Sequence, residues 1–178
     1  GTPGRQAGRR DVAPLVALEP PFRLLVLGGS GGARVLNETL LEIATPLLEQ
    51  FPDWEILHQA GVQEFERLEA RPRHPRHTLA PFIEAVDEAL EGASLVLSRS
   101  GASTCSELKA CGRPALLVPL PQSAGDHQRH NALALAAEGR AHVLEQSGTF
   151  QTELRERLSA LMSDREARTG LSRPEANH

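Results

Sequence analysis

The chain has 178 residues, of which 40% are hydrophobic, so it can bury one core of ordinary domain size. Lysine and arginine number 19 against 23 aspartates and glutamates, and the net charge of -4 gives no electrostatic case for nucleic acid as a partner. No apolar stretch approaches the roughly 20 residues of a spanning helix, and the first residues lack a signal-peptide centre, so we expect a soluble, cytoplasmic domain.

Short apolar runs alternate with segments of helical periodicity from residue 23 onward. The apolar runs predict strands at residues 23–27, 55–58, 78–79, 95–97, 115–118 and 141–144. The intervening segments predict helices at residues 33–50, 62–70, 82–92, from about 103, 126–139 and 150–162. Pro46 should disturb the first helix. This alternation predicts an α/β fold, a Rossmann-like, doubly wound parallel sheet of about six strands with helices on both faces.

Two end segments stand outside this alternation. Residues 1–21, rich in glycine, arginine and proline, are predicted to be a linker, and residues 166–178, which end in LSRPEANH, a flexible tail. The folded domain is therefore expected to span residues 22–165. Inside it, the run RPRHPRH at residues 71–77 is interpreted as a solvated basic loop before a strand.

The segment GGSGGA, residues 28–33, joins the first predicted strand to the first helix. Glycines there let the backbone approach a ligand, and the helix N-terminus offers unpaired N–H groups to an anion, so we expect a phosphate-type ligand. An NAD fingerprint is disfavoured, because Arg34 stands where its third glycine belongs and His58-Gln59 replaces the acidic residue after the second strand. A nucleoside-triphosphate P-loop is excluded, because the segment has no lysine.

The segment SRSGASTCSE, residues 98–107, leads from the fourth predicted strand into a helix. Ser103 or Thr104 is predicted to cap that helix, which places Glu107 about one turn in. Glu107 then has two interpretations: a capping-box carboxylate that reaches back to the helix start, or an acceptor for both hydroxyls of a ribose. Sequence spacing leaves both open.

Five motifs follow one another along the chain: GGSGGARVLNET, HQAG, the pair Phe82-Ile83, SRSGASTCSE with GRPALLVPLP, and DHQRHNA. This ordered set, within residues 23–146, resembles the MurG family, the bacterial N-acetylglucosaminyltransferases of peptidoglycan synthesis. The resemblance implies the carboxyl-terminal half of a two-domain GT-B glycosyltransferase, with residues 22–165 as its UDP-sugar donor-binding domain. GTPGR at the start resembles the family's interdomain segment, which would make residues 1–21 an interdomain linker.

The resemblance also implies roles for particular residues. Glu107 would bind the ribose diol, and Ser30 with the glycine-loop N–H groups would face the diphosphate. The backbone of Ile83 would pair with the uracil edge, with Phe82 beside it. The substrate-binding residues implied in this way are Arg5, Gly29, Ser30, Gly31, Phe82, Ile83, Ser100, Gly101, Ala102, Thr104, Glu107, His127, Gln128 and Asn131.

The motif DHQRHNA would supply the contacts to the sugar. Gln128 and Asn131 match amides that the family turns toward the sugar hydroxyls, and their spacing of three places them on one face of a helix N-terminus. His127 stands where the family often has glutamine. Arg5, from the interdomain segment, would approach the leaving diphosphate.

The implied reaction is an inverting transfer that converts lipid I to lipid II. Its implied partners are UDP-N-acetylglucosamine, an amino-terminal acceptor domain, and lipid I through that domain; no cofactor, metal or nucleic acid is expected. Because the general base should come from the acceptor half, no catalytic residue is assigned here and the isolated chain is not expected to turn over. The full-length enzyme would lie peripherally at the inner face of the cell membrane.

Three alternatives stay open on sequence alone. The chain could be the donor-binding half or subunit of another UDP-sugar GT-B transferase. It could be a nucleotide-binding module without catalysis, for which Gln128 and Asn131 would be dispensable. In a purely structural domain, the glycines would serve packing and Glu107 would be a cap.

Overall fold

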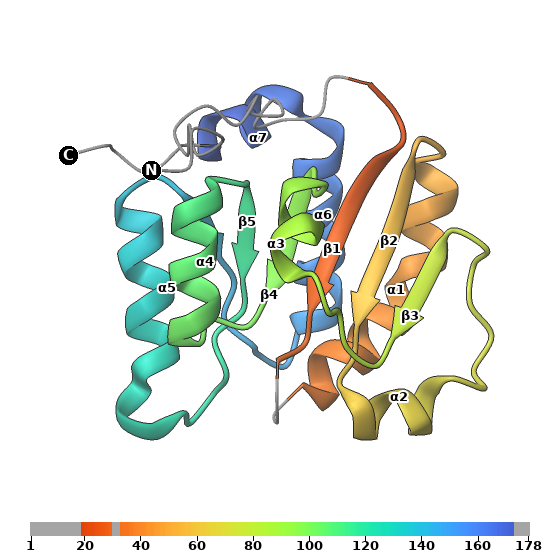
Figure 1. The fold of residues 1–178 in the computed structure, drawn as a ribbon, viewed down its shortest axis with the longest axis horizontal. Coiled ribbons are helices and arrows are strands. Elements are labelled where there is room, and N and C mark those ends of the chain that lie inside the picture. Colours follow the sequence, from red (N-terminus) through yellow and green to blue (C-terminus); the bar gives the residue numbers. More distant parts are fainter. Residues whose placement is uncertain (1–18, 30–32, 173–178) are drawn as a thin grey trace, which may run out of the picture.

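The computed structural model describes residues 19–29 and 33–172, which form one sheet with helices around it (Figure 1). All strand pairs are parallel, and the strand order is β3-β2-β1-β4-β5-β6. The strands are β1 Phe22–Leu27, β2 Trp54–Gln59, β3 His77–Ala80, β4 Leu95–Ser98, β5 Ala115–Leu117 and β6 Ala141–Val143. The helices are α1 Arg34–Gln50, α2 Val62–Leu68, α3 Val86–Glu91, α4 Ala102–Cys111, the short 3₁₀ helix η1 Ala124–Asp126, α5 His127–Ala137, α6 Phe150–Ser163 and α7 Arg165–Leu171.

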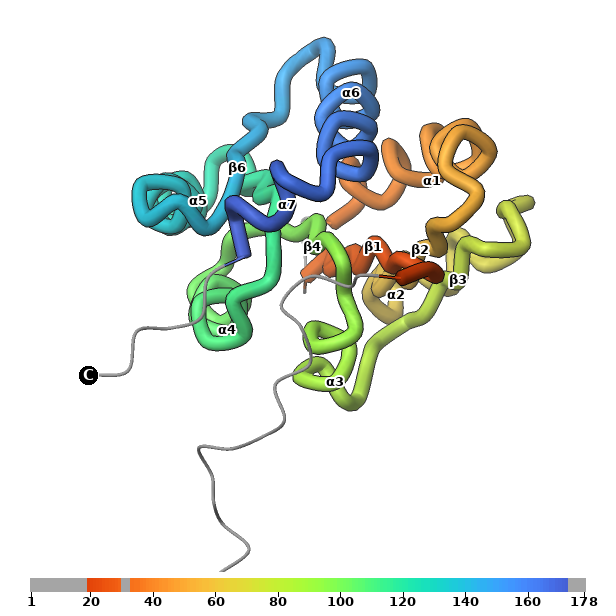
Figure 2. The backbone as a smooth tube through the Cα atoms, turned by 90° about the horizontal axis from the view of Figure 1, so that it is seen from above, coloured from red at the N-terminus to blue at the C-terminus, as the bar shows by residue number. Residues whose placement is uncertain are grey.

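The helices cover both faces of the sheet. In Figure 2, α1 and α6 lie on one side of the strands, and α3 and α4 lie on the other. Helix α5 packs beside α4 on that second side. The Rossmann-like, doubly wound fold predicted from the sequence is therefore confirmed.

Strand β1 shows why the apolar runs are continuous rather than alternating. Leu24 and Val26 point into the core under α1 and α6, whereas Leu25 and Leu27 belong to the core under α3, α4 and α5. Successive side chains of a strand point to opposite faces, so a strand covered on both faces must be apolar at every position. The resulting central strands align their carboxyl ends at one edge of the sheet.

Two helices differ from the sequence-based expectations. Pro46 lies inside α1, which continues to Gln50 because the neighbouring core side chains Leu47 and Leu48 hold the last turn against the sheet. Helix α3 begins only at Val86, so Phe82 and Ile83 lie in the loop before it and do not open a helix. The backbone of these two residues is therefore part of the loop that follows β3.

The carboxyl-terminal region is packed further than expected. The sequence predicted a flexible tail from residue 166, but α7 extends to Leu171, which is buried in the core. Arg168 in this helix is 3% exposed and its guanidinium lies over the rings of Phe22 and Trp54. The packed domain therefore reaches at least residue 171, and the remaining part of the predicted tail, residues 173–178, lies outside the described residues. The predicted linker likewise lies outside them up to residue 18.

The basic loop before β3 makes more contacts than a solvated loop would. Arg76 donates from Nη2 to the carbonyl of Leu48 at 2.5 Å and from Nη1 to the carbonyls of Phe51 and Trp54, the former at 3.2 Å. Because the last carbonyls of a helix have no partner within the helix, this arginine satisfies the end of α1. The loop thus fixes the end of α1 to the start of β2.

Candidate functional site

A cleft of about 770 Å³ lies at the carboxyl ends of β1, β2 and β3. Its walls come from the loops that follow these three strands and from the first turns of α4. In open parallel sheets, ligands bind at this edge, next to the point where the strand order reverses, which here lies between β1 and β4. The residues that line it are Leu27, Gly29, Ala33, Arg34, Gln59, Ala60, Gly61, Val62, Gln63, Glu64, Pro81, Phe82, Val86, Ser103, Thr104 and Glu107.

Four of the predicted site residues meet in this cleft. Gly29 arrives from the end of β1, Phe82 from the loop after β3, and Thr104 and Glu107 from α4. Gly29 has a φ of +80° and nothing within 4 Å of the place where a side chain would project. Phe82 is 53% exposed, although it is a large apolar side chain. An open backbone, an exposed ring and a carboxylate around one cleft are suited to a ligand with polar and flat aromatic parts.

Helix α4 begins one residue earlier than expected. Its N-cap is Gly101, without a side-chain cap hydrogen bond, so Ser103 and Thr104 lie within the first turn and cap nothing. Glu107 is one turn further on and accepts a long hydrogen bond of 3.5 Å from the Ser103 hydroxyl. The capping-box interpretation of Glu107 is therefore wrong, because such a glutamate would bond the N-cap backbone. Its carboxylate is left facing the cleft.

The first residues of α4 expose backbone to this region. Ala102 is exposed, and nothing lies within 4 Å of the place where a side chain on Gly101 would project. The N–H groups of a first helical turn have no partner within the helix and carry the positive end of its dipole. The edge beside Glu107 can thus accommodate an anion close to the backbone.

Ser100 is the buried centre of a polar junction between α4 and α5. Its hydroxyl donates to the backbone carbonyl of Gln128 at 2.7 Å, and its own carbonyl accepts from the Asn131 amide at 3.0 Å. The side-chain oxygen of Gln128 accepts from the N–H of Leu120 at 2.9 Å and from that of Ser100 at 3.3 Å. One end of each amide thus ties α5 to the loops that follow β4 and β5. Neither amide lines the cleft described above.

The remaining predicted site residues lie elsewhere. Ile83 packs against the core under α3 and α4 rather than lining the cleft. His127 is exposed at the start of α5, and a Cβ on Gly125 would lie 3.2 Å from its Nε2, so the ring folds back over its own turn. Arg5, Ser30 and Gly31 lie outside the described residues.

Several lining residues were not singled out from the sequence. Gln59, Gly61, Gln63 and Glu64 come from the end of β2 and the start of α2, and Arg34 opens α1. The available signal was HQAG, because a polar pair and a glycine directly after a strand stand at the same sheet edge as the glycine loop. Gly61 has a φ of +88°, which explains the glycine in that motif.

Two ionisable groups, one in the SRSG loop and one in the helix after it, have shifted pKa values. Burial lowers the pKa of Arg99 to about 10, which leaves the guanidinium protonated at neutral pH, and it donates to the Val118 carbonyl at 3.3 Å. Burial raises the pKa of the Cys105 thiol to about 11, so this cysteine stays uncharged. At neutral pH the loop therefore carries a buried positive charge, and the thiol on α4 is not a nucleophile.

The sequence matches a family model described as the glycosyltransferase family 28 C-terminal domain, over residues 23–177. The chain belongs to this family. Two curated relatives of the family 28 domain are both named UDP-N-acetylglucosamine--N-acetylmuramyl-(pentapeptide) pyrophosphoryl-undecaprenol N-acetylglucosamine transferase. The Azotobacter vinelandii relative is 46% identical over 155 residues, which cover 85% of this chain and 43% of the relative. The Halorhodospira halophila relative is 41% identical over 187 residues, which cover 98% of this chain and 49% of the relative.

A solved structure agrees with these relatives. The crystal structure of Acinetobacter baumannii MurG superimposes on the family 28 domain with a TM-score of 0.69 and 34% identity, covering 88% of this chain and 45% of that chain. The chain thus spans less than half the length of these proteins. The resemblance to the carboxyl-terminal domain of MurG, inferred from the ordered motifs, is confirmed.

Two features are absent from the described part of this family 28 domain. None of its helices is both long and apolar enough to pass through a membrane. Within residues 19–29 and 33–172, no three histidine, cysteine or acidic side chains gather in a way that could hold a metal ion.

Proposed function

We propose that this chain binds UDP-N-acetylglucosamine as the donor domain of an inverting N-acetylglucosaminyltransferase that converts lipid I to lipid II in peptidoglycan synthesis. The observation that carries the proposal is the cleft in which Gly29, Phe82, Thr104 and Glu107 meet from three separate segments of the chain. The names of the family 28 relatives support the choice of sugar and of acceptor.

Each group in the cleft has a part that its chemistry suits. The carboxylate of Glu107 accepts hydrogen bonds from both hydroxyls of the ribose, and the exposed ring of Phe82 lies beside the uracil. The first-turn N–H groups of α4 and the backbone at Gly29 face the diphosphate. As UDP leaves, negative charge builds on the diphosphate, and these fixed dipoles stabilise it without having to reorient.

The acceptor hydroxyl and its general base belong to the other domain of such an enzyme. This chain contributes by holding the anomeric carbon in place and by stabilising the leaving group. We infer that it binds nucleotide sugar but does not transfer it alone, and that the complete enzyme is a peripheral protein of the inner membrane face. Formation of lipid II by the purified chain would contradict this division of labour.

Calorimetric titration with UDP, UDP-N-acetylglucosamine and UDP-glucose tests the proposal. Glu107→Ala should weaken binding of every uridine ligand by roughly 10- to 100-fold, because hydrogen bonds to a charged group contribute about 1.5–3 kcal/mol. The matched control is Glu88→Ala, which removes the same charge from an exposed position on α3 outside the cleft. It should bind like the unchanged chain.

A ligand with one hydroxyl fewer shows whether Glu107 contacts the ribose. The 2′-deoxy form of UDP should bind the unchanged chain more weakly than UDP does, whereas Glu107→Ala should bind both ligands equally. If removing the 2′-hydroxyl weakened binding equally in the unchanged chain and in Glu107→Ala, the carboxylate would not contact that hydroxyl. A preference for UDP-glucose over the N-acetyl sugar would instead favour another UDP-sugar transferase.

A further inference from the structure

A buried polar array lies behind the wall of the cleft. Asn37 on α1 and His58 on β2 are completely buried, and His77 on β3 is 4% exposed. The two imidazole rings are stacked, with centroids 5.3 Å apart and planes inclined by 11°. Burying polar groups so deeply costs folding free energy unless their hydrogen bonds are satisfied, so each group in this array needs a partner.

The contacts of Asn37 fix the direction of every hydrogen bond in the array. Its Nδ2 donates to the carbonyl oxygen of Ala60 at 2.9 Å, so its Oδ1 is the acceptor that faces His58 Nε2 at 2.8 Å. His58 must therefore carry its proton on Nε2, which leaves Nδ1 to accept from Nε2 of His77 at 3.1 Å. One directed chain thus runs from β3 through β2 and α1 to the loop after β2.

The same asparagine lies against the end of β1. A Cβ on Gly28 would be 3.1 Å from Oδ1 of Asn37 and 3.0 Å from the carbonyl oxygen of Gln59, so only glycine fits there without displacing one of them. The N–H of Gly28 donates to that Gln59 carbonyl at 3.0 Å, and the N–H of Ala60 donates to Ala80 at 2.9 Å. The ends of β1, β2 and β3 therefore meet at one buried amide.

This meeting point lies directly behind the cleft. Gly29, Gln59, Ala60 and Gly61, which continue from these strand ends, all line it. A shift of the Ala60 carbonyl would therefore move the backbone of the cleft wall relative to Gly28 and Gly29.

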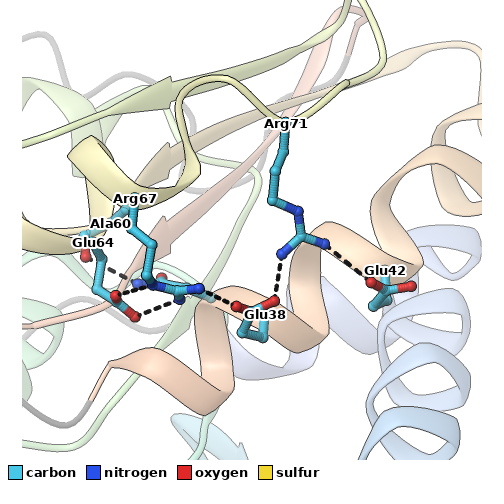
Figure 3. Close-up of polar contacts among 7 residues, drawn as sticks. Glu38, Glu42, Ala60, Glu64, Arg67 and Arg71 are labelled. Atoms are coloured by element: carbon cyan, nitrogen blue, oxygen red, sulfur yellow. Dashed lines mark hydrogen bonds and ion pairs between the residues drawn. The ribbon is translucent and has the colours of Figure 1, made fainter.

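A second connection between α1 and this wall runs over the surface. In Figure 3, Glu38 bridges Arg67 and Arg71, Arg67 also pairs with Glu64, and Arg71 reaches Glu42. These side chains are between 19% and 56% exposed, and exposed ion pairs contribute only about 0–1 kcal/mol each. The surface network can orient α2, but the satisfied buried array is the stiffer connection.

We propose that Asn37 is a positioning residue of the cleft: held in one orientation by the His77–His58 pair, it fixes the Ala60 carbonyl and so sets the spacing between Gly28-Gly29 at the end of β1 and the loop after β2. The expected effect on ligand binding rests on the proposed function, whereas the claim that Asn37 fixes the Ala60 carbonyl does not.

The array requires both imidazoles to be neutral. Burial is the main reason that the pKa values of both histidines are low; His77 and Arg73 lower the pKa of His58 further, and Arg73 and His74 lower that of His77. A protonated His58 would need to donate from Nδ1, which faces a donor, so the chain of hydrogen bonds would break.

Amide hydrogen exchange measured by NMR on the whole chain tests the positioning role. Asn37→Asp removes the donor to Ala60 and should accelerate exchange at Gly28 and Ala60 at least 10-fold. The N–H of Val118, which donates to Ser98 at 2.8 Å between β4 and β5, reports on global unfolding. The proposal requires that Gly28 and Ala60 accelerate more than Val118; equal acceleration at all three would overturn it.

Three further variants keep the test decisive if Asn37→Asp does not fold. Ile43→Val trims a core side chain on the same helix and should change exchange only through global stability. His77→Leu removes the donor at the far end of the chain and should loosen Gly28 and Ala60, whereas His77→Gln keeps a donor and should not. Identical exchange in His77→Leu and His77→Gln would overturn the proposal.

Two more readouts separate positioning from ligand binding. The imidazole signals of His58 should titrate at higher pH in Asn37→Asp, because a carboxylate beside Nε2 favours the protonated ring; an unchanged titration would contradict the assigned contact. UDP affinity should fall about 10-fold in Asn37→Asp and stay unchanged in Ile43→Val. If the unchanged chain bound no UDP, the proposed function would fail, while the exchange measurements would still decide the positioning role.

Discussion

The free energy of unfolding should fall by about 4 kcal/mol between pH 7 and pH 5. His58 and His77 each contribute about 2 kcal/mol to this fall, because each is protonated more easily in the unfolded chain. Burial is the main cause that lowers the pKa of His58 to about 3 and that of His77 to about 4, from an ordinary value of 6.5. Below pH 6.5, His58 and His77 therefore each bind a proton in the unfolded chain, whereas both stay neutral in the folded chain. The stability is fully present above pH 6.5 and is lost as the pH falls toward the folded-state values.

Urea unfolding at a series of pH values measures this loss. Glu38 and Glu64, whose pKa values are lowered mainly by hydrogen bonds from arginines, lose their charges only below the pH range used, so the histidines dominate between pH 7 and pH 5. Burial also lowers the pKa of His142, which adds a loss that the unchanged chain and the variant below share. His77→Gln keeps a donor to His58 but cannot titrate, so its loss over the same range should be about half that of the unchanged chain. Equal losses in the two proteins would show that His77 does not carry the effect.

Replacing Arg168 by methionine should destabilise the domain by roughly 3 kcal/mol, because one guanidinium makes two kinds of contact in a nearly dry site. It donates to the carbonyls of Leu161 and Met162, both at 2.7 Å, and so satisfies the end of α6. Its guanidinium carbon Cζ lies 5.0 Å from the ring centroid of Trp54 and 5.6 Å from that of Phe22. Methionine would fill the space but leave the two carbonyls without this donor.

Chemical unfolding with the tryptophan signal of Trp54 measures the change directly, since this is the only tryptophan in the chain. Glu166→Ala, at an exposed position of α7, is the control and should change the stability by less than about 0.5 kcal/mol. If Arg168→Met were as mild as this control, the contacts of the Arg168 guanidinium would not be what holds α7 on the domain.

Sequence patterns predicted the local features of the domain well. The positions of β1 and β4 follow from their apolar runs, because a strand covered on both faces is mainly apolar, and the glycine loop follows from the glycines directly after β1. Boundaries were less well predicted where packing decides them. Pro46 stays inside α1, since buried leucines hold the turns around it. Helix α7 forms because Arg168 and Leu171 pack against residues far away in the sequence, which the local segment cannot reveal.

The candidate site was predicted only where a motif carries its own chemistry. Glu107 and Gly29 stand out because a carboxylate in a helix's second turn and a glycine after a strand have few local explanations. Ser100 and Asn131 were grouped with the ligand-binding residues, but the contacts they make in the structure join α5 to the loop after β4. A polar residue in a motif does not reveal whether its partner is a ligand or a neighbouring loop.

The sequence by itself determined the alternation of strands and helices, the glycine loop and the carboxylate in the second turn of α4, since each depends on residues close together in the chain. Only the tertiary structure decided that Asn37, His58 and His77 form one hydrogen-bonded array behind the cleft wall. Their meeting depends on the order β3-β2-β1 and on the register that pairs Ile56 with His77. Strand order and register are set by packing between distant segments, and no local pattern of residues encodes them.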